Sequence, residues 1–358
     1  MATRPVFDPD AAAAAGSGIF GLPFTPTTSR VVILPVPFEA TTSYGGGASR
    51  APAAVLEASR QVDLYDRATG RPYEHGIAML PIPKDILRWN REAKPLAARV
   101  IAAQGSPLER SAPVARARAR VNALGDRVNA WTRRETGRLL DEGRIVFVLG
   151  GDHAAPFGAI DAFAARHPGL GILHLDAHCD LRDAYEGFTW SHASIFHNVA
   201  SRLPKVARIV QVGVRDMGSR EADFIRRSRG RIVLFHDDDI GARAARGVAW
   251  ERIVRDIVSK LPKRVYLSFD IDGLDPTLCP NTGTPVPGGL SFRQLTGLLA
   301  GVVASGRTIV GGDLCEVSPG PDGEWDANVG ARVLYKMIGY ALASQPGPPK
   351  RSRRRASR

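Results

Sequence analysis

Three residues of metal-binding type occupy alternate positions where an apolar run of the chain ends. The stretch is LHLDAHCDL, and the alternate residues are Asp176, His178 and Asp180. Side chains along an extended chain point to opposite faces in turn, so these three can converge on one point. Mixed carboxylate and imidazole ligands are typical of Mn, Fe, Co, Ni or Zn sites. The pattern therefore predicts a metal site.

The same residue types follow two other apolar runs. RIVFVLG leads into GDH with His153, and RVYLSF leads into DID with Asp270 and Asp272. Four aspartates buried in one place would repel one another and resist ionisation unless cations neutralise them. Six ligands are many for one ion, but they suit two ions roughly 3.5–4 Å apart, which lower the pKa of a bridging water.

Two neighbours of these ligands are assigned to packing. His174 has the same parity as the ligands but lies deeper in the apolar run, so we interpret it as a packed or ligand-supporting residue. Cys179 should face the opposite side as a small buried hydrophobe. With Cys279 and Cys315 it makes an odd cysteine count without close pairing, which argues against a disulfide framework and predicts a cytoplasmic protein.

Apolar runs alternate with helical patterns through most of the chain. We expect strands at 30–38, 144–150, 171–176, 208–214, 231–236, 264–272 and 308–317. We expect helices at 51–66, 156–167, 246–260, 291–303 and 326–344, and mostly helical structure from about 95 to 142, including an amphipathic helix at 110–138. The segment 70–95 is expected to be irregular. This alternation predicts an α/β fold with a parallel sheet covered on both faces. Ligands of such sheets bind outside the carboxyl ends of the strands, where the candidate ligands occur.

The composition indicates a globular chain with one domain. The 358 residues are 44% hydrophobic, and no apolar run approaches the ~18–20 residues that cross a bilayer. There is no internal repeat or long linker, so we expect a flexible segment 1–29, a single domain 30–343 and a basic tail 344–358. The tail carries six of the basic residues behind the net charge of +12, and we interpret it as disordered. Nucleic-acid or scaffold binding through this tail is the minor alternative, and we expect neither nucleic-acid nor membrane partners.

The motifs GGDH, LDAHCDL and SFDIDGLDP occur in the order found in the ureohydrolase family of arginases and agmatinases. VPFEATTSYGGGASRAPAAVLEAS, PNTGTPVPGGLSFRQL and DLCEVSP resemble further segments of that family, so the resemblance spans about residues 30–343. It implies a three-layer α/β/α sandwich with a mostly parallel eight-stranded sheet. It also implies two Mn²⁺ ions per subunit, urea release from a small cationic guanidino substrate, and a homo-oligomer, usually a trimer or hexamer.

The resemblance also assigns roles to single residues. One Mn²⁺ would be held by His153, Asp176, Asp180 and Asp270, and the other by Asp176, His178, Asp270 and Asp272. Glu316 matches the glutamate that pairs with the substrate guanidinium, which is a suitable role because carboxylates bind this planar cation in bidentate fashion. His192 in WSHASIF matches an active-site-loop histidine, although Ala193 stands where relatives commonly have glycine. Asp180 would relay a proton to the leaving amine.

The substrate must be predicted from the loop LRDAYEGFTWSHAS. It lacks the asparagine and the Ser-Gly-Asn stretch of arginases, which disfavours arginine and favours an agmatinase-type enzyme that makes putrescine and urea. Asp183 and Glu186 could attract the distal ammonium of agmatine or could be surface acids. Arg182 could instead meet a carboxylate, as in guanidinobutyrate. Guanidinopropionate, arginine and formimino compounds remain alternative substrates, whereas a metallophosphoesterase is disfavoured because the chain has no GHxH motif.

Overall fold

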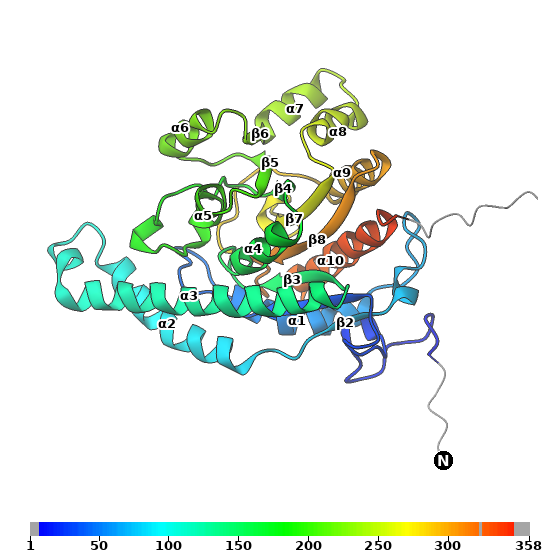
Figure 1. The fold of residues 1–358 in the computed structure, drawn as a ribbon, viewed down its shortest axis with the longest axis horizontal. Coiled ribbons are helices and arrows are strands. Elements are labelled where there is room, and N and C mark those ends of the chain that lie inside the picture. The colour runs from blue at the N-terminus through cyan, green and yellow to red at the C-terminus, as the bar shows by residue number, and fades with distance from the viewer. Residues whose placement is uncertain (1–6, 322–323, 347–358) are drawn as a thin grey trace, which may run out of the picture.

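An eight-stranded sheet forms the centre of the molecule (Figure 1). The computed structural model describes residues 7–321 and 324–346. The strands are β1 (Val31–Val36), β2 (Ile77–Met79), β3 (Ile145–Gly150), β4 (Leu170–Leu175), β5 (Val206–Val214), β6 (Ile232–His236), β7 (Arg264–Asp270) and β8 (Thr308–Cys315). Their order across the sheet is β2-β1-β3-β8-β7-β4-β5-β6, and each neighbouring pair is parallel.

Helices cover both faces of this sheet (Figure 1). They are α1 (Ala51–Ala58), α2 (Lys84–Ala102), α3 (Ala112–Asp141), α4 (Phe157–Arg166), α5 (Ile195–Arg202), α6 (Ser219–Arg227), α7 (Asp237–Ala245), α8 (Trp250–Ser259), α9 (Phe292–Ala304) and α10 (Trp325–Ala343). Alternate side chains of β1 point to opposite faces of the sheet and enter two separate apolar cores. Val31 and Ile33 belong to the first core, and Val32 and Leu34 belong to the second. The first core is closed by α1 and α7–α10 and the second by α2–α6, which confirms the expected three-layer α/β/α sandwich.

The segment expected to be irregular, 70–95, contains two regular elements, so that prediction was wrong. β2 pairs with β1 at the edge of the sheet, and its three residues are too few to give a readable pattern. α2 begins at Lys84, directly after a proline-rich stretch that obscured its start. Its buried residues Ile86, Ala93, Ala97 and Val100 recur at helical spacing, which places one face of α2 in the core.

The folded part of the chain extends beyond both predicted limits of the domain. Within the N-terminal segment expected to be flexible, Ile19, Phe20 and Leu22 are buried, and the Phe20 N–H donates to Ser59 Oγ at 2.8 Å. These apolar side chains therefore pack against the core although they precede residue 30. At the other end, the Ile309 N–H donates to the Ser344 hydroxyl at 2.9 Å. The rest of the predicted tail, 347–358, lies outside the described residues.

Two broader expectations also meet the structure. All three cysteines are buried free thiols, as expected for a chain without a disulfide framework. In the part of the chain that the structure describes, no helix is long and apolar enough to cross a membrane.

The sheet order explains where the candidate ligands meet. β3, β8, β7 and β4 are consecutive neighbours at the centre of the sheet. His153 follows β3, Glu316 follows β8, Asp270 ends β7 and Asp176 follows β4. Because parallel strands end at the same edge, these four side chains reach one place.

Candidate metal centre and substrate pocket

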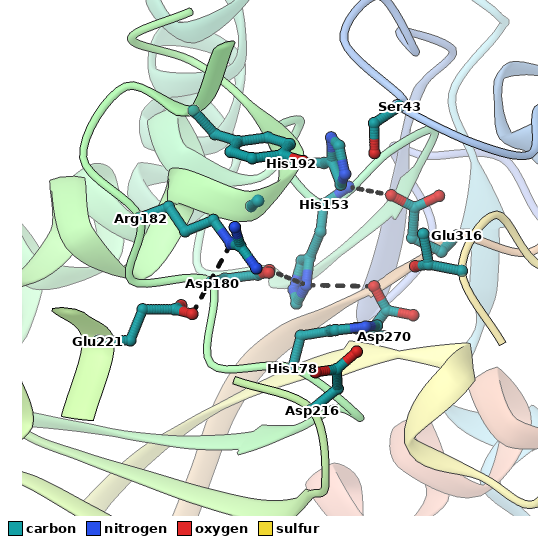
Figure 2. Close-up of a pocket in the computed structure, with 13 residues that line it drawn as sticks. Ser43, His153, His178, Asp180, Arg182, His192, Asp216, Glu221, Asp270 and Glu316 are labelled. Carbon is teal, nitrogen blue, oxygen red and sulfur yellow. Dashed lines mark hydrogen bonds and ion pairs between the residues drawn. The ribbon is translucent and has the colours of Figure 1, made fainter. Parts of the chain in front are cut away.

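One half of the centre is arranged around His153, which is fully buried. Its Nδ1 lies 3.1 Å from Asp176 Oδ2, 3.1 Å from Asp180 Oδ2 and 3.4 Å from Asp270 Oδ2. Figure 2 shows the Asp180 and Asp270 carboxylates on either side of this ring. One imidazole nitrogen therefore faces three carboxylates that come from two further strand ends.

The other half is arranged around His178. Its Nδ1 lies 3.1 Å from Asp272 Oδ2 and 3.4 Å from Asp176 Oδ1. Asp176 thus presents Oδ2 to one histidine and Oδ1 to the other. A carboxylate that faces two ligand groups with its two oxygens is suited to bridge two cations, as the sequence resemblance implied for this residue.

The side chains converge by a route that differs from simple strand alternation. β4 has already ended before Asp176, and Asp180 has a left-handed φ of 53°. Asp272 lies in a 3-10 turn, where its N–H donates to Asp270 Oδ1 at 2.9 Å. These residues meet as predicted, but the reason differs from the one expected. The turns that follow the strands orient the side chains, whereas the prediction relied on the alternation of side chains along an extended strand.

Tight contacts between these turns require glycine. A Cβ on Gly151 of the GGDH motif would lie 1.9 Å from the Phe38 carbonyl oxygen. A Cβ on Gly273 would lie 2.7 Å from the Asp176 nitrogen. Any larger residue at either position would push apart the segments that carry the ligands.

A second set of buried groups orients the ligands. His153 Nε2 lies 3.0 Å from Ser268 Oγ, and the Ser268 hydroxyl donates to Asp313 at 2.9 Å. His174 Nε2 lies 2.8 Å from Asp176 Oδ2, which matches the supporting role expected for this histidine. Such outer contacts fix the ring orientation and tautomer of metal-binding histidines.

The electrostatics of the centre favour cations. Burial raises the pKa of Asp180 to about 7, and the Asp176 charge adds to this rise. Burial and the neighbouring carboxylates Asp272 and Asp176 hold the pKa of Asp270 well above its ordinary value. Although burial opposes the charged form of His178, its bonds to Asp176 and Asp272 raise its pKa to about 12. His153, His174, Asp176 and Asp180 form one group that could hold a metal ion, and Asp176, His178 and Asp272 form another. Such imidazole and carboxylate donors fit divalent cations.

Glu316 and His192 each present a buried polar atom at this centre. Glu316 has a φ of 60°, and its Oε1 accepts the His153 N–H at 3.0 Å. Glu316 Oε2 and His192 Nδ1 are buried and have no hydrogen-bond partner within residues 7–321 and 324–346. Burial, together with Asp270 and Asp152, raises the pKa of Glu316 well above its usual range. Burial and the nearby His178 lower the pKa of His192 to about 4, so this imidazole is neutral at pH 7.

A cavity of about 180 Å³ opens onto the centre (Figure 2). Among the predicted site residues it is lined by His153, His178, Asp180, His192, Asp270 and Glu316. Its wall also contains residues that the sequence analysis did not assign to the site, namely Ser43, Tyr185, Asp216, Glu221 and Thr284. Asp216 carried a readable signal, because it is an acid shortly after the carboxyl end of an apolar strand.

The two acids expected to contact the distal end of the substrate do not line this cavity. The side chain of Asp183 is 83% exposed, and its Oδ1 lies 3.7 Å from His197 Nδ1. Glu186 has a φ of 55°, and its Oε2 is buried away from the cavity wall. Asp183 is therefore a surface acid, the second of the two alternatives considered for it, and Glu186 lies outside the cavity lining although its neighbour Tyr185 belongs to it.

The loop after β1 forms one wall of the cavity through Ser43. It is anchored by Glu39, which is 1% exposed and accepts the Gly47 N–H at 2.9 Å. Lys94 of α2 donates to the same Glu39 oxygen at 2.5 Å. α2, whose first half fell in the segment expected to be irregular, thus helps to hold this wall of the cavity.

Together the fold and the site define a parallel α/β protein with a buried centre of two histidines and four aspartates at the carboxyl edge of its sheet. The model of the arginase family matches residues 29–339, so the chain belongs to that family. This confirms the ureohydrolase resemblance read from the three motifs.

Individual relatives are similar over most of the chain. N(1)-aminopropylagmatine ureohydrolase of Thermus thermophilus is 34% identical over 325 residues, which cover 90% of this chain and 94% of that protein. Guanidinobutyrase of Pseudomonas aeruginosa is 33% identical over 213 residues, covering 57% of this chain and 63% of that protein. The crystal structure of agmatine ureohydrolase of Thermoplasma volcanium aligns with a TM-score of 0.71 at 22% identity, covers 92% of this chain and 96% of that one, and supports the fold.

Proposed function

We propose that the chain is a dinuclear manganese hydrolase that cleaves a guanidino compound to urea and an amine, with agmatine as the preferred substrate and putrescine as the amine. The observation that carries this proposal is the buried Glu316 Oε2, which has no partner in the described part of the chain and faces the cavity beside the histidine–aspartate centre. A planar guanidinium cation would supply the missing hydrogen bond and the opposite charge.

The residues that would hold the two Mn²⁺ ions are those that the family resemblance assigns, and the contacts of His153 and His178 support this assignment. One set is His153, Asp176, Asp180 and Asp270, and the other is Asp176, His178, Asp270 and Asp272. When bound, such a pair of ions supplies a water of lowered pKa for attack on the guanidinium carbon.

The chain's own side chains would do the remaining work. Glu316 binds and orients the guanidinium, and its burial makes a cation the natural partner of its charged form. Asp180 lines the cavity, and we assign to it the relay of a proton from the attacking water to the leaving amine. His192 is neutral at pH 7 and lines the cavity, so it can exchange a hydrogen bond or a proton with the substrate.

A guanidino acid is the second candidate substrate, because Arg182 also lines the cavity and a relative is named guanidinobutyrase. We further propose a cytoplasmic homo-oligomer, a trimer or hexamer, as the working form.

The test is urea release by the Mn²⁺-loaded protein from agmatine, 4-guanidinobutanoate, 3-guanidinopropanoate and arginine. We expect agmatine to have the highest kcat/KM. The variant Glu316→Gln keeps the shape but loses the charge, and we expect its kcat/KM to fall roughly 100- to 1000-fold, as for loss of one preorganised electrostatic partner. An unchanged melting temperature controls for folding. No urea from any of the four compounds would contradict the proposed function.

A further inference from the structure

The wall of the cavity carries an acid, Asp216, that the sequence analysis did not assign to the site. Asp216 follows β5, and its N–H donates to the Ala177 carbonyl at 3.1 Å. This backbone contact pairs Asp216 with His178, so its side chain lies beside a ligand of the centre (Figure 2). Asp216 is exposed and lines the cavity, and no hydrogen bond or ion pair involves its carboxylate within the described ranges of the chain.

The cation on the same wall, Arg182, is already compensated by the protein. Its Nε lies 3.7 Å from Glu221 Oε2, and its guanidinium lies 4.8 Å from the centre of the Tyr185 ring (Figure 2). Glu221 is itself buried and fixed, because it accepts the Leu181 N–H at 2.9 Å and the Gly218 N–H at 2.7 Å. Arg182 is therefore paired and stacked, whereas Asp216 is unpaired.

Two carboxylates that line the cavity thus lack a cation within the described residues. Glu316 presents a buried, unpartnered oxygen, and Asp216 presents an exposed carboxylate. A substrate with two positive ends joined by an alkyl chain would satisfy both groups. A substrate with a terminal carboxylate would bring like charges together at Asp216, a contact that costs affinity.

We propose that Asp216 is a specificity-determining residue that binds the distal ammonium of a guanidino-amine, while Glu221 keeps Arg182 from recognising a substrate carboxylate. This inference rests on the proposed function and names the residue that separates guanidino-amines from guanidino acids. It replaces the loop acids Asp183 and Glu186 in that role.

The experiment compares agmatine with butylguanidine, which has the same alkyl chain but no distal ammonium, in the wild type and in Asp216→Asn. We expect the ratio of kcat/KM values, agmatine over butylguanidine, to fall about tenfold in the variant, through KM, as for the loss of one hydrogen bond to a charged group. The loss should shrink in high salt because Asp216 is exposed. Asp223→Asn removes an acid of α6 outside the cavity wall and serves as the matched control.

Each outcome decides the proposal. A ratio that stays within twofold of the wild type would overturn it. An equal loss for both substrates, together with reduced Mn²⁺ content, would also overturn it, because Asp216 would then support His178. The proposal would also be overturned if the wild type preferred 4-guanidinobutanoate and Arg182→Met selectively lost turnover of that compound. If the wild type released no urea from any guanidine, the proposed function itself would fail, which is a different result from an unchanged ratio.

Discussion

Ser268 gives the sharpest test of how the centre is built. Its hydroxyl has a single proton, which it donates to Asp313 at 2.9 Å. Ser268 Oγ therefore accepts a hydrogen bond from His153 Nε2 at 3.0 Å. All three residues are fully buried. This relay keeps a proton on Nε2 and orients the ring so that Nδ1 faces the carboxylates of the centre.

The change Ser268→Ala removes the relay without adding bulk. His153 Nε2 loses its acceptor, while Asp313 keeps the Phe269 N–H at 3.2 Å. Loss of an outer-shell partner reduces metal affinity by about 10- to 100-fold, which equals about 1.4–2.7 kcal/mol. Each buried group left short of a partner also costs about 1–3 kcal/mol of folding stability. We therefore expect a folded but less stable protein with one weakened metal position.

The measurement is calorimetric titration of Mn²⁺ into chelator-treated protein. The loss should fall on the position held by His153, whereas the position held by His178 should change little, because the relay does not contact His178. Ser259→Ala at the exposed end of α8 is the matched control. Two unchanged affinities in a folded Ser268→Ala protein would refute the relay.

Two further predictions concern the entrance and the charge of the centre. Lys94→Met removes the cation beside the buried Glu39, and we expect the free energy of unfolding to fall by about 1–2 kcal/mol. This loss is smaller than for a fully buried ion pair because the Lys94 side chain is 46% exposed. Burial opposes the charged form of Glu39, but the bond from Lys94 favours it, and the pKa of Glu39 is lowered. The loss of stability in Lys94→Met should therefore shrink as the pH falls below about 4, which denaturant unfolding measures. Because burial raises the pKa of Asp180 from 3.8 to about 7, the metal-free protein should lose stability as pH rises through that window. Binding of Mn²⁺ needs the charged carboxylate, so the melting-temperature gain from Mn²⁺ should grow between pH 5 and 8, and a flat gain would contradict this account.

The chemistry of the centre could be predicted from the sequence because its information is local. His153, Asp176 and Asp270 each follow or end an apolar run, and the polar residue types stand out against their neighbours. In a parallel sheet, such positions must meet at one edge, whatever the details of the connections. Short elements at the edge of the fold do not have such a readable local pattern. β2 has three residues, and the start of α2 is obscured by prolines, so neither gave a periodic pattern.

The sequence by itself therefore predicted the class of fold and the histidines and aspartates that cluster at the edge of the sheet, while the tertiary structure decided which charged groups line the cavity. Asp183 and Asp216 are both acids in loops that follow strands, yet only the second lines the cavity. The backbone bond from Asp216 to Ala177 holds Asp216 beside the strand ends, whereas the side chain of Asp183 is 83% exposed. Loop orientation depends on contacts between segments distant in the chain, and no local spacing encodes those contacts.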